Sequence, residues 1–208
     1  METKEIRAFD FEVKAEETDR GKQISGRAIV FDSPTDMGWY REIIDDGALT
    51  DTDLRDVRFL VNHNTDMIPL ARSRNNNANS TMQLEVVPGG GMDIRVNLDT
   101  ENNSDARSLY SATEREDITG MSFMMLVGRD RWEDLETDYP TRHIEAINKV
   151  LEVSAVTFPA YAQTTLTARG LEDALESAKT SLESARAEAR EAALMERRRK
   201  TIKILLEV

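Results

Sequence analysis

The chain has 208 residues, no cysteine and a formal net charge of −12, with charged residues making up 32% of the sequence. The absence of cysteine excludes disulfides and thiolate metal sites, and the acidic balance argues against a protein that binds nucleic-acid phosphates. No apolar run approaches the roughly 20 residues of a membrane span, and the first ten residues lack the apolar stretch of a signal peptide, so we expect a cytoplasmic protein that binds neither nucleic acid nor a membrane.

Alternating or β-prone residues predict strands in the first half of the chain. These segments are residues 5–14, 23–31, 57–61, 81–87 and 92–98. A turn at Gly21 is expected to join the first two strands, and the Pro-Gly-Gly-Gly run at 88–91 the last two. Residues 45–55 resemble a short helix, and the polar run at 75–80 predicts a loop. Such alternation is typical of a half-buried antiparallel sheet.

The second half combines one helix with further strands. Ser104 is expected to cap a helix that runs to Glu116 and ends before Gly120. Strands are then predicted at 121–128, 132–135 and 144–157, with a break at 137–140. The fold class is therefore predicted to be α+β, mainly an antiparallel β-barrel with a few surrounding helices. About 165 residues suffice to bury a single core.

The residue pattern changes from strand-like to helical after Gly170. Leu and Ala recur there at spacings of three and four, which predicts one long amphipathic C-terminal helix; they are Leu171, Leu175, Ala178, Leu182, Ala185, Ala189 and Ala193. Because this stripe is mostly Ala, we expect a body at 1–168 that folds without the helical tail at 169–208. The tail is either a solvated helix or a segment that docks on a partner.

His63 and Ser122 are the candidates for chemistry. The chain has only two histidines, and His63 stands in an Asn-His-Asn run directly after a predicted strand. Ser122 lies at the start of an apolar run, after Gly120 and Met121. A nucleophilic hydroxyl needs a nearby base, which His63 could supply. Each residue taken alone is more typical of an ordinary hydrogen-bonded side chain.

Several separated segments of the chain resemble the prohead proteases of tailed bacteriophages, which process capsid proteins during head assembly. In chain order these segments are G-R-A-I-V-F at 26–31, E-I-I and G-A-L within 42–49, N-H-N at 62–64 with I-P-L at 68–70, I-T-G-M-S-F at 118–123, and L-E-V-S-A-V-T-F-P-A at 151–160. The resemblance extends over about residues 5 to 165. It also implies a fold similar to that of the herpesvirus assembly proteases.

The resemblance implies roles for particular residues. Ser122 would be the nucleophile, His63 the general base, and Glu152 the acidic residue that orients the imidazole. His143 is the alternative third member, because the herpesvirus proteases use a second histidine there. Arg129 or Arg131 could donate to the oxyanion, as an arginine does in the herpesvirus fold.

The function implied by the resemblance is that of a serine endopeptidase, without a cofactor or metal, that cleaves capsid and scaffold precursors and itself. Its partners would be the major capsid protein precursor with its scaffold segment, and further copies of the chain. It would act inside the assembling prohead in the host cytoplasm.

Two other classes of protein remain open from the sequence. One is a non-catalytic capsid-assembly or scaffolding protein that keeps the same barrel. The other is a metal-dependent hydrolase that uses His63, Asp66 and His143, although two histidines and no cysteine make a closed metal site improbable.

Overall fold

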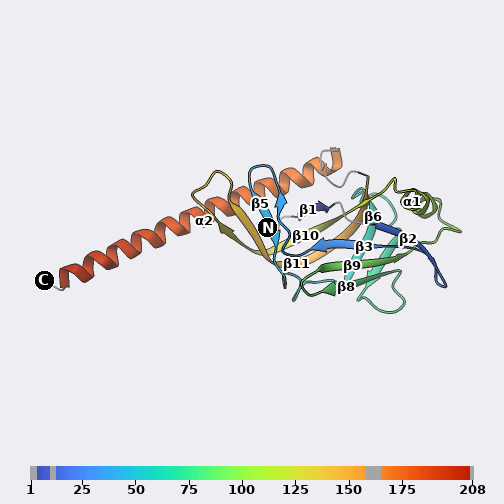
Figure 1. Ribbon diagram of the computed structural model, residues 1–208, viewed down its shortest axis with the longest axis horizontal. Helices are drawn as coiled ribbons and strands as arrows, with labels where there is room; N and C mark the ends of the chain where they lie inside the picture. The colour runs from blue at the N-terminus through green and yellow to red at the C-terminus, as the bar shows by residue number, and fades with distance from the viewer. Residues whose placement is uncertain (1–3, 10–12, 158–164, 207–208) are drawn as a thin grey trace.

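The computed structural model describes residues 4–9, 13–157 and 165–206. These residues form two sheets, with eleven strands in all, and two helices (Figure 1). The first sheet has four antiparallel strands in the order β2 (Val13–Thr18), β3 (Gly21–Val30), β9 (Gly91–Asn97) and β8 (Met82–Val87). The predicted turns at Gly21 and at 88–91 join β2 to β3 and β8 to β9. Gly91 has a φ of 140°, and a Cβ on it would lie 1.9 Å from the Ile29 carbonyl oxygen. Only glycine therefore lets β9 approach β3 so closely.

The second sheet has seven strands and is mixed. Its main path is β1 (Lys4–Phe9), β10 (Gly120–Glu133), β11 (Thr141–Val156), β5 (Arg41–Ile44) and β4 (Thr35–Asp36). β11 also pairs with β6 (Asp56–Val61), which pairs with β7 (Ala71–Arg74). The pairings of β11 with β5 and with β6 are parallel, whereas the other pairings of this sheet are antiparallel, in line with the expected mainly antiparallel arrangement.

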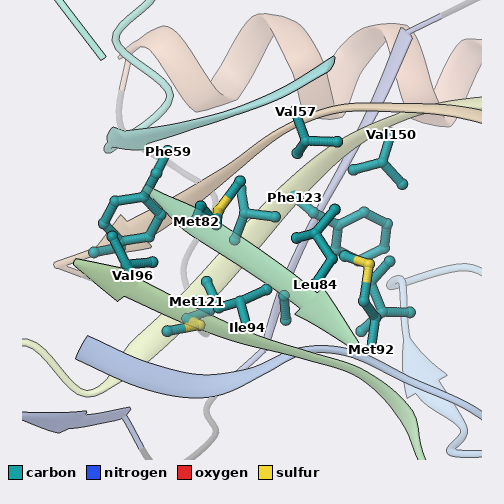
Figure 2. Close-up of a cluster of buried hydrophobic side chains, with 14 of the residues drawn as sticks. Val57, Phe59, Met82, Leu84, Met92, Ile94, Val96, Met121, Phe123 and Val150 are labelled. Atoms are coloured by element: carbon teal, nitrogen blue, oxygen red, sulfur yellow. The ribbon is translucent and has the colours of Figure 1, made fainter. Parts of the chain in front are cut away.

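The apolar core lies between the two sheets (Figure 2). Met82, Ile94 and Val96 of the four-stranded sheet meet Phe59 and Phe123 of the seven-stranded one, and each is fully buried. The α+β class is confirmed, but the described strands form two separate sheets, so a closed barrel is not confirmed. Residues 5–14 were predicted as one strand, but they contribute β1 to one sheet and β2 to the other.

Three local predictions are corrected by the structure. Residues 45–55 form no helix but turns at 46–51 and an isolated bridge from Asp53 to Lys149, because Gly47 adopts a φ of 90° that a right-handed helix excludes. The helix α1 (Ser104–Glu114) is capped by Asn103, whose side chain accepts from two backbone N–H groups of the first turn. β10 continues through the stretch predicted as two strands, because register shifts along its pairing with β11 absorb the irregularity.

The helix α2 (Thr165–Leu206) has two different halves. Ala174, Ala178 and Leu182 are buried, and the last two pack with Tyr40 and Trp132. By contrast, residues 187–203 are all exposed, and this half projects away from the sheets (Figure 1). The proximal half thus contacts the body more than its Ala-rich stripe suggested, and a boundary at 168/169 stays a prediction.

Two leucines of α2 offer a direct test of this division. Leu182→Ala should lower the free energy of unfolding by about 2–4 kcal/mol, because it removes a buried side chain. Leu194 is 50% exposed on the distal half, so Leu194→Ala should change the free energy of unfolding by less than about 0.5 kcal/mol. Urea unfolding of both variants measures the difference. Equal effects would mean that the proximal half is not docked in solution.

A buried cluster of charges anchors β1 to the rest of its sheet. Arg7 pairs with Glu42 in a bidentate geometry and with Glu5 at 2.5 Å. Arg142 pairs with Glu5 at 2.8 Å and with Glu42 at 3.2 Å. All four side chains are at most 2% exposed. Two arginines therefore balance two glutamates, as buried charges require.

The cluster predicts a pH-dependent stability. Burial raises the pKa of Glu5, but Arg7 and Arg142 together lower it further, so the net pKa is below its ordinary value. A lowered folded-state pKa contributes stability above the unfolded-state value of about 4.3, and this contribution is lost as the pH falls through the folded-state pKa. Glu5→Gln should lower the free energy of unfolding by about 3–5 kcal/mol at pH 7. The difference in this free energy between the variant and the wild type should become smaller below about pH 4.

Denaturant unfolding from pH 7 to pH 3 checks this expectation. Glu188→Gln, at an exposed position of α2, is the matched control and should follow the wild-type curve. A constant gap between Glu5→Gln and the wild type at all pH values would contradict the assigned ionisation of Glu5.

Candidate active site

His63 lies in a turn that directly follows β6. Asn62 and His63 adopt left-handed backbone conformations, with φ of 51° and 57°. Such a conformation costs a non-glycine residue about 1–2 kcal/mol, so neighbouring contacts must hold it. The Asn62 N–H donates to the Ala155 carbonyl at 2.9 Å, and its side chain exchanges hydrogen bonds with Thr157. β11 therefore fixes the turn that carries the imidazole.

Ser122 lies on a strand of the seven-stranded sheet that has a neighbouring strand on each side. It is on β10, opposite Ala8 of β1 on one side and Ser154 of β11 on the other. Its neighbours Met121 and Phe123 point into the core between the sheets. Since side chains alternate along a strand, Ser122 points to the opposite face.

Glu152 reaches the same face from β11. The register pairs Ser122 with Ser154 and Met124 with Glu152, and residues two apart on a strand share a face. The L-E-V-S run therefore places a carboxylate and a hydroxyl beside the serine of the neighbouring strand.

The three side chains form a hydrogen-bonded chain. His63 Nε2 lies 2.5 Å from Ser122 Oγ, and His63 Nδ1 lies 2.6 Å from Glu152 Oε1. Exposed fractions are 0% for Ser122, 5% for His63 and 3% for Glu152. When Nδ1 carries the proton and donates to Glu152, Nε2 is free to accept the proton of Ser122. This is the hydrogen-bond order by which a general base activates a serine.

The Ser122 hydroxyl has a second acceptor within reach. Ser122 Oγ lies 2.7 Å from the carbonyl oxygen of Arg7 in β1. A hydroxyl has one proton, so donation to Arg7 excludes donation to His63. Transfer of the proton to the imidazole therefore requires that the hydrogen bond to β1 be broken.

His143 has other partners, and Asp66 is exposed. His143 Nδ1 lies 2.7 Å from Asp45, and Nε2 lies 3.6 Å from Glu133. Asp66 is exposed in the turn after His63. Among the described residues, no group of three or more side chains that could hold a metal ion is found, so the structure does not gather His63, Asp66 and His143.

Arg129 and Arg131, the candidate oxyanion donors, lie on the exposed part of β10. Both guanidinium groups pair with Glu145, at 2.8 Å and 3.0 Å, and Arg131 also pairs with Glu133. Their side chains are 70% and 46% exposed. A role at the oxyanion stays a prediction for both.

Two groups at the site were missed from the sequence. The Arg7 carbonyl is a backbone group, which carries no sequence signal. Ser154 donates to Glu152 Oε2 at 2.5 Å and accepts from the His63 N–H at 3.1 Å. Its place two residues after Glu152 was the available signal, because that spacing puts both side chains on one face of a strand.

A buried imidazole that bridges a serine hydroxyl and a carboxylate is the arrangement typical of serine hydrolases. Comparison with known families agrees with this class. Residues 9–177 match the caudovirus prohead serine proteases, and the chain belongs to this family of serine peptidases. No curated protein and no solved structure matches the chain significantly. In the part of the chain that the structure describes, no helix is long and apolar enough to cross a membrane.

The two candidate third members are separated by a pair of variants. Glu152→Gln should lower peptidase activity by about 10⁴-fold, because an amide in place of the carboxylate can select the wrong imidazole tautomer. His143→Ala should stay near the wild type, because that imidazole is bonded to Asp45. Initial rates of precursor cleavage measure both. The reverse order of activities would assign the role to His143.

Proposed function

We propose that this chain is a serine endopeptidase that cleaves capsid and scaffold precursor proteins, and itself, during phage prohead maturation. The observation that carries the proposal is the chain of hydrogen bonds from Ser122 through His63 to Glu152. It is found in a protein of the prohead serine protease family, at the residues that the resemblance had singled out.

The reaction uses these residues in order. His63 Nε2 takes the hydroxyl proton as Ser122 Oγ attacks the peptide carbonyl carbon, and Glu152 stabilises the imidazolium that forms. His63 then gives the proton to the leaving amine, and the C–N bond breaks to leave an acyl-enzyme. A water molecule, deprotonated by His63, releases the acid and restores the Ser122 hydroxyl.

The oxyanion formed in each step needs N–H donors, and their contribution to the rate is usually large. Arg129 and Arg131 are the side chains proposed for this role. Both would have to leave their ion pairs with Glu145 to do so. They follow Ser122 on β10 by seven and nine residues, about 23 Å and about 30 Å along an extended strand, so the role requires a rearrangement of the strand and not of the side chains alone.

The proposed substrates are the major capsid protein precursor and its scaffold segment, inside the assembling prohead in the host cytoplasm. Burial of Ser122 supports an enzyme whose site is closed at rest, because the hydroxyl is fully buried and can donate to the Arg7 carbonyl. The exposed distal half of α2 is the proposed contact with the scaffold or with another copy.

The alternative function is a non-catalytic capsid-assembly protein that keeps the same two sheets. Such a protein would need no acceptor for the Ser122 proton. The 2.5 Å approach of His63 Nε2 to Ser122 Oγ therefore favours the enzyme.

Replacement of the nucleophile separates these functions. Ser122→Ala should leave the fold intact and lower cleavage of the co-expressed capsid precursor by at least about 10³-fold, because the attacking oxygen is lost. Ser108→Ala is the control, since Ser108 is exposed on α1 and bonds only its own helix. Gel analysis of the precursor and circular dichroism of both variants measure the outcome. Wild-type processing by Ser122→Ala protein would refute the proposed mechanism.

A further inference from the structure

Ser154 occupies a central position that the reaction described above does not use. It is fully buried on β11, directly opposite Ser122 in the pairing with β10. Its hydroxyl makes two hydrogen bonds of opposite sense. It donates to Glu152 Oε2 at 2.5 Å, and it accepts from the His63 backbone N–H at 3.1 Å.

The first hydrogen bond orients the carboxylate. Glu152 presents Oε1 to His63 and Oε2 to Ser154. A carboxylate with a donor at each oxygen cannot rotate about its last torsion without losing both bonds. Ser154 therefore keeps Oε1 directed at Nδ1, and it supplies a donor to a charge that is removed from water.

The second hydrogen bond holds the backbone of the base. The His63 N–H lies in a left-handed turn, with φ of 57°, at a side chain that is 5% exposed. A buried N–H group needs an acceptor, and the one it has is Ser154 Oγ. The same hydroxyl thus ties the base to the residue that orients it.

We propose that Ser154 is a positioning residue of this site, which acts through His63 and Glu152 and does not touch the substrate. This inference rests on the proposed function. Loss of an outer hydrogen-bond partner of a metal-ligating side chain typically costs about 10- to 100-fold in activity, and by analogy we expect a loss of that size in kcat when the hydroxyl is removed. KM should stay unchanged, because no contact with the peptide is lost.

The test compares three variants. Ser154→Ala removes the hydroxyl, and Ser154→Thr keeps it and should retain most of the wild-type kcat. Ser73→Ala is the matched control, because Ser73 is equally buried on β7 and its hydroxyl has no hydrogen-bond partner among the described residues. The kinetics use a peptide that spans a processing site of the capsid precursor, mapped with the wild-type enzyme, and urea unfolding gives the folded fraction of each variant.

A second measurement is independent of proteolysis. In a Ser122→Ala background, the low-field proton resonance of His63 Nδ1–H reports the bond to Glu152. Adding Ser154→Ala should broaden this resonance and speed its exchange with water, while adding Ser73→Ala should not.

The outcomes are distinct. A kcat for Ser154→Ala within about threefold of the wild type, below the expected range, would overturn the inference. The inference would also be overturned if Ser154→Ala lowered the stability but left the kcat per folded molecule and the His63 resonance unchanged. If the wild-type chain cleaves no capsid precursor, the proposed function fails, while the exchange of the His63 proton still decides whether Ser154 positions the imidazole.

Discussion

The pairing of β11 with β10 on one side and with β6 on the other is the constraint on which the candidate site depends. The first pairing sets Ser154 opposite Ser122, and the second sets Val61 opposite Ala155, so the chain leaves β6 beside Ser154 and delivers His63 there. A slip of one residue in either register would move these side chains to the other face of the sheet. The apolar core restrains the register, because Met121 and Phe123 must face inward.

Burial strengthens the hydrogen bonds that Glu152 makes with His63 and Ser154. Hydrogen bonds to a charged group are stronger where water is excluded, and an unpaired charge there is costly. Glu152 meets this demand with two donors, His63 and Ser154. β1 also affects the site, because its Arg7 carbonyl can accept a hydrogen bond from the Ser122 hydroxyl. The ionic cluster of Arg7 with Glu42 holds that strand in place, so rearrangement of β1 is linked to the breaking of buried ion pairs.

The two halves of α2 differ in their contacts with the rest of the protein. The Trp132 ring N–H donates to Ser181 at 3.0 Å, and Arg186 donates to the Leu135 carbonyl at 2.8 Å. The proximal half of α2 is therefore packed against the sheets and their connecting loops. Beyond residue 186 the helix leaves the surface with Leu194, Met195 and Ile202 exposed, which is consistent with the contact proposed for a partner inside the prohead.

The sequence by itself predicted most of the strands and singled out the residues of the candidate site. Period-two alternation predicted β8 and β9 nearly to the residue, and the scarcity of histidine, together with the ordered family segments, singled out His63, Ser122 and Glu152. Tertiary structure decided what local pattern cannot encode. The run at 5–14 was predicted as one strand, yet it serves two sheets, because the choice of a partner strand depends on contacts with distant residues. Ser154 looked like any buried strand hydroxyl until the parallel pairing with β6 brought the His63 amide to it, since a hydrogen bond across 91 residues is set by register and not by sequence spacing.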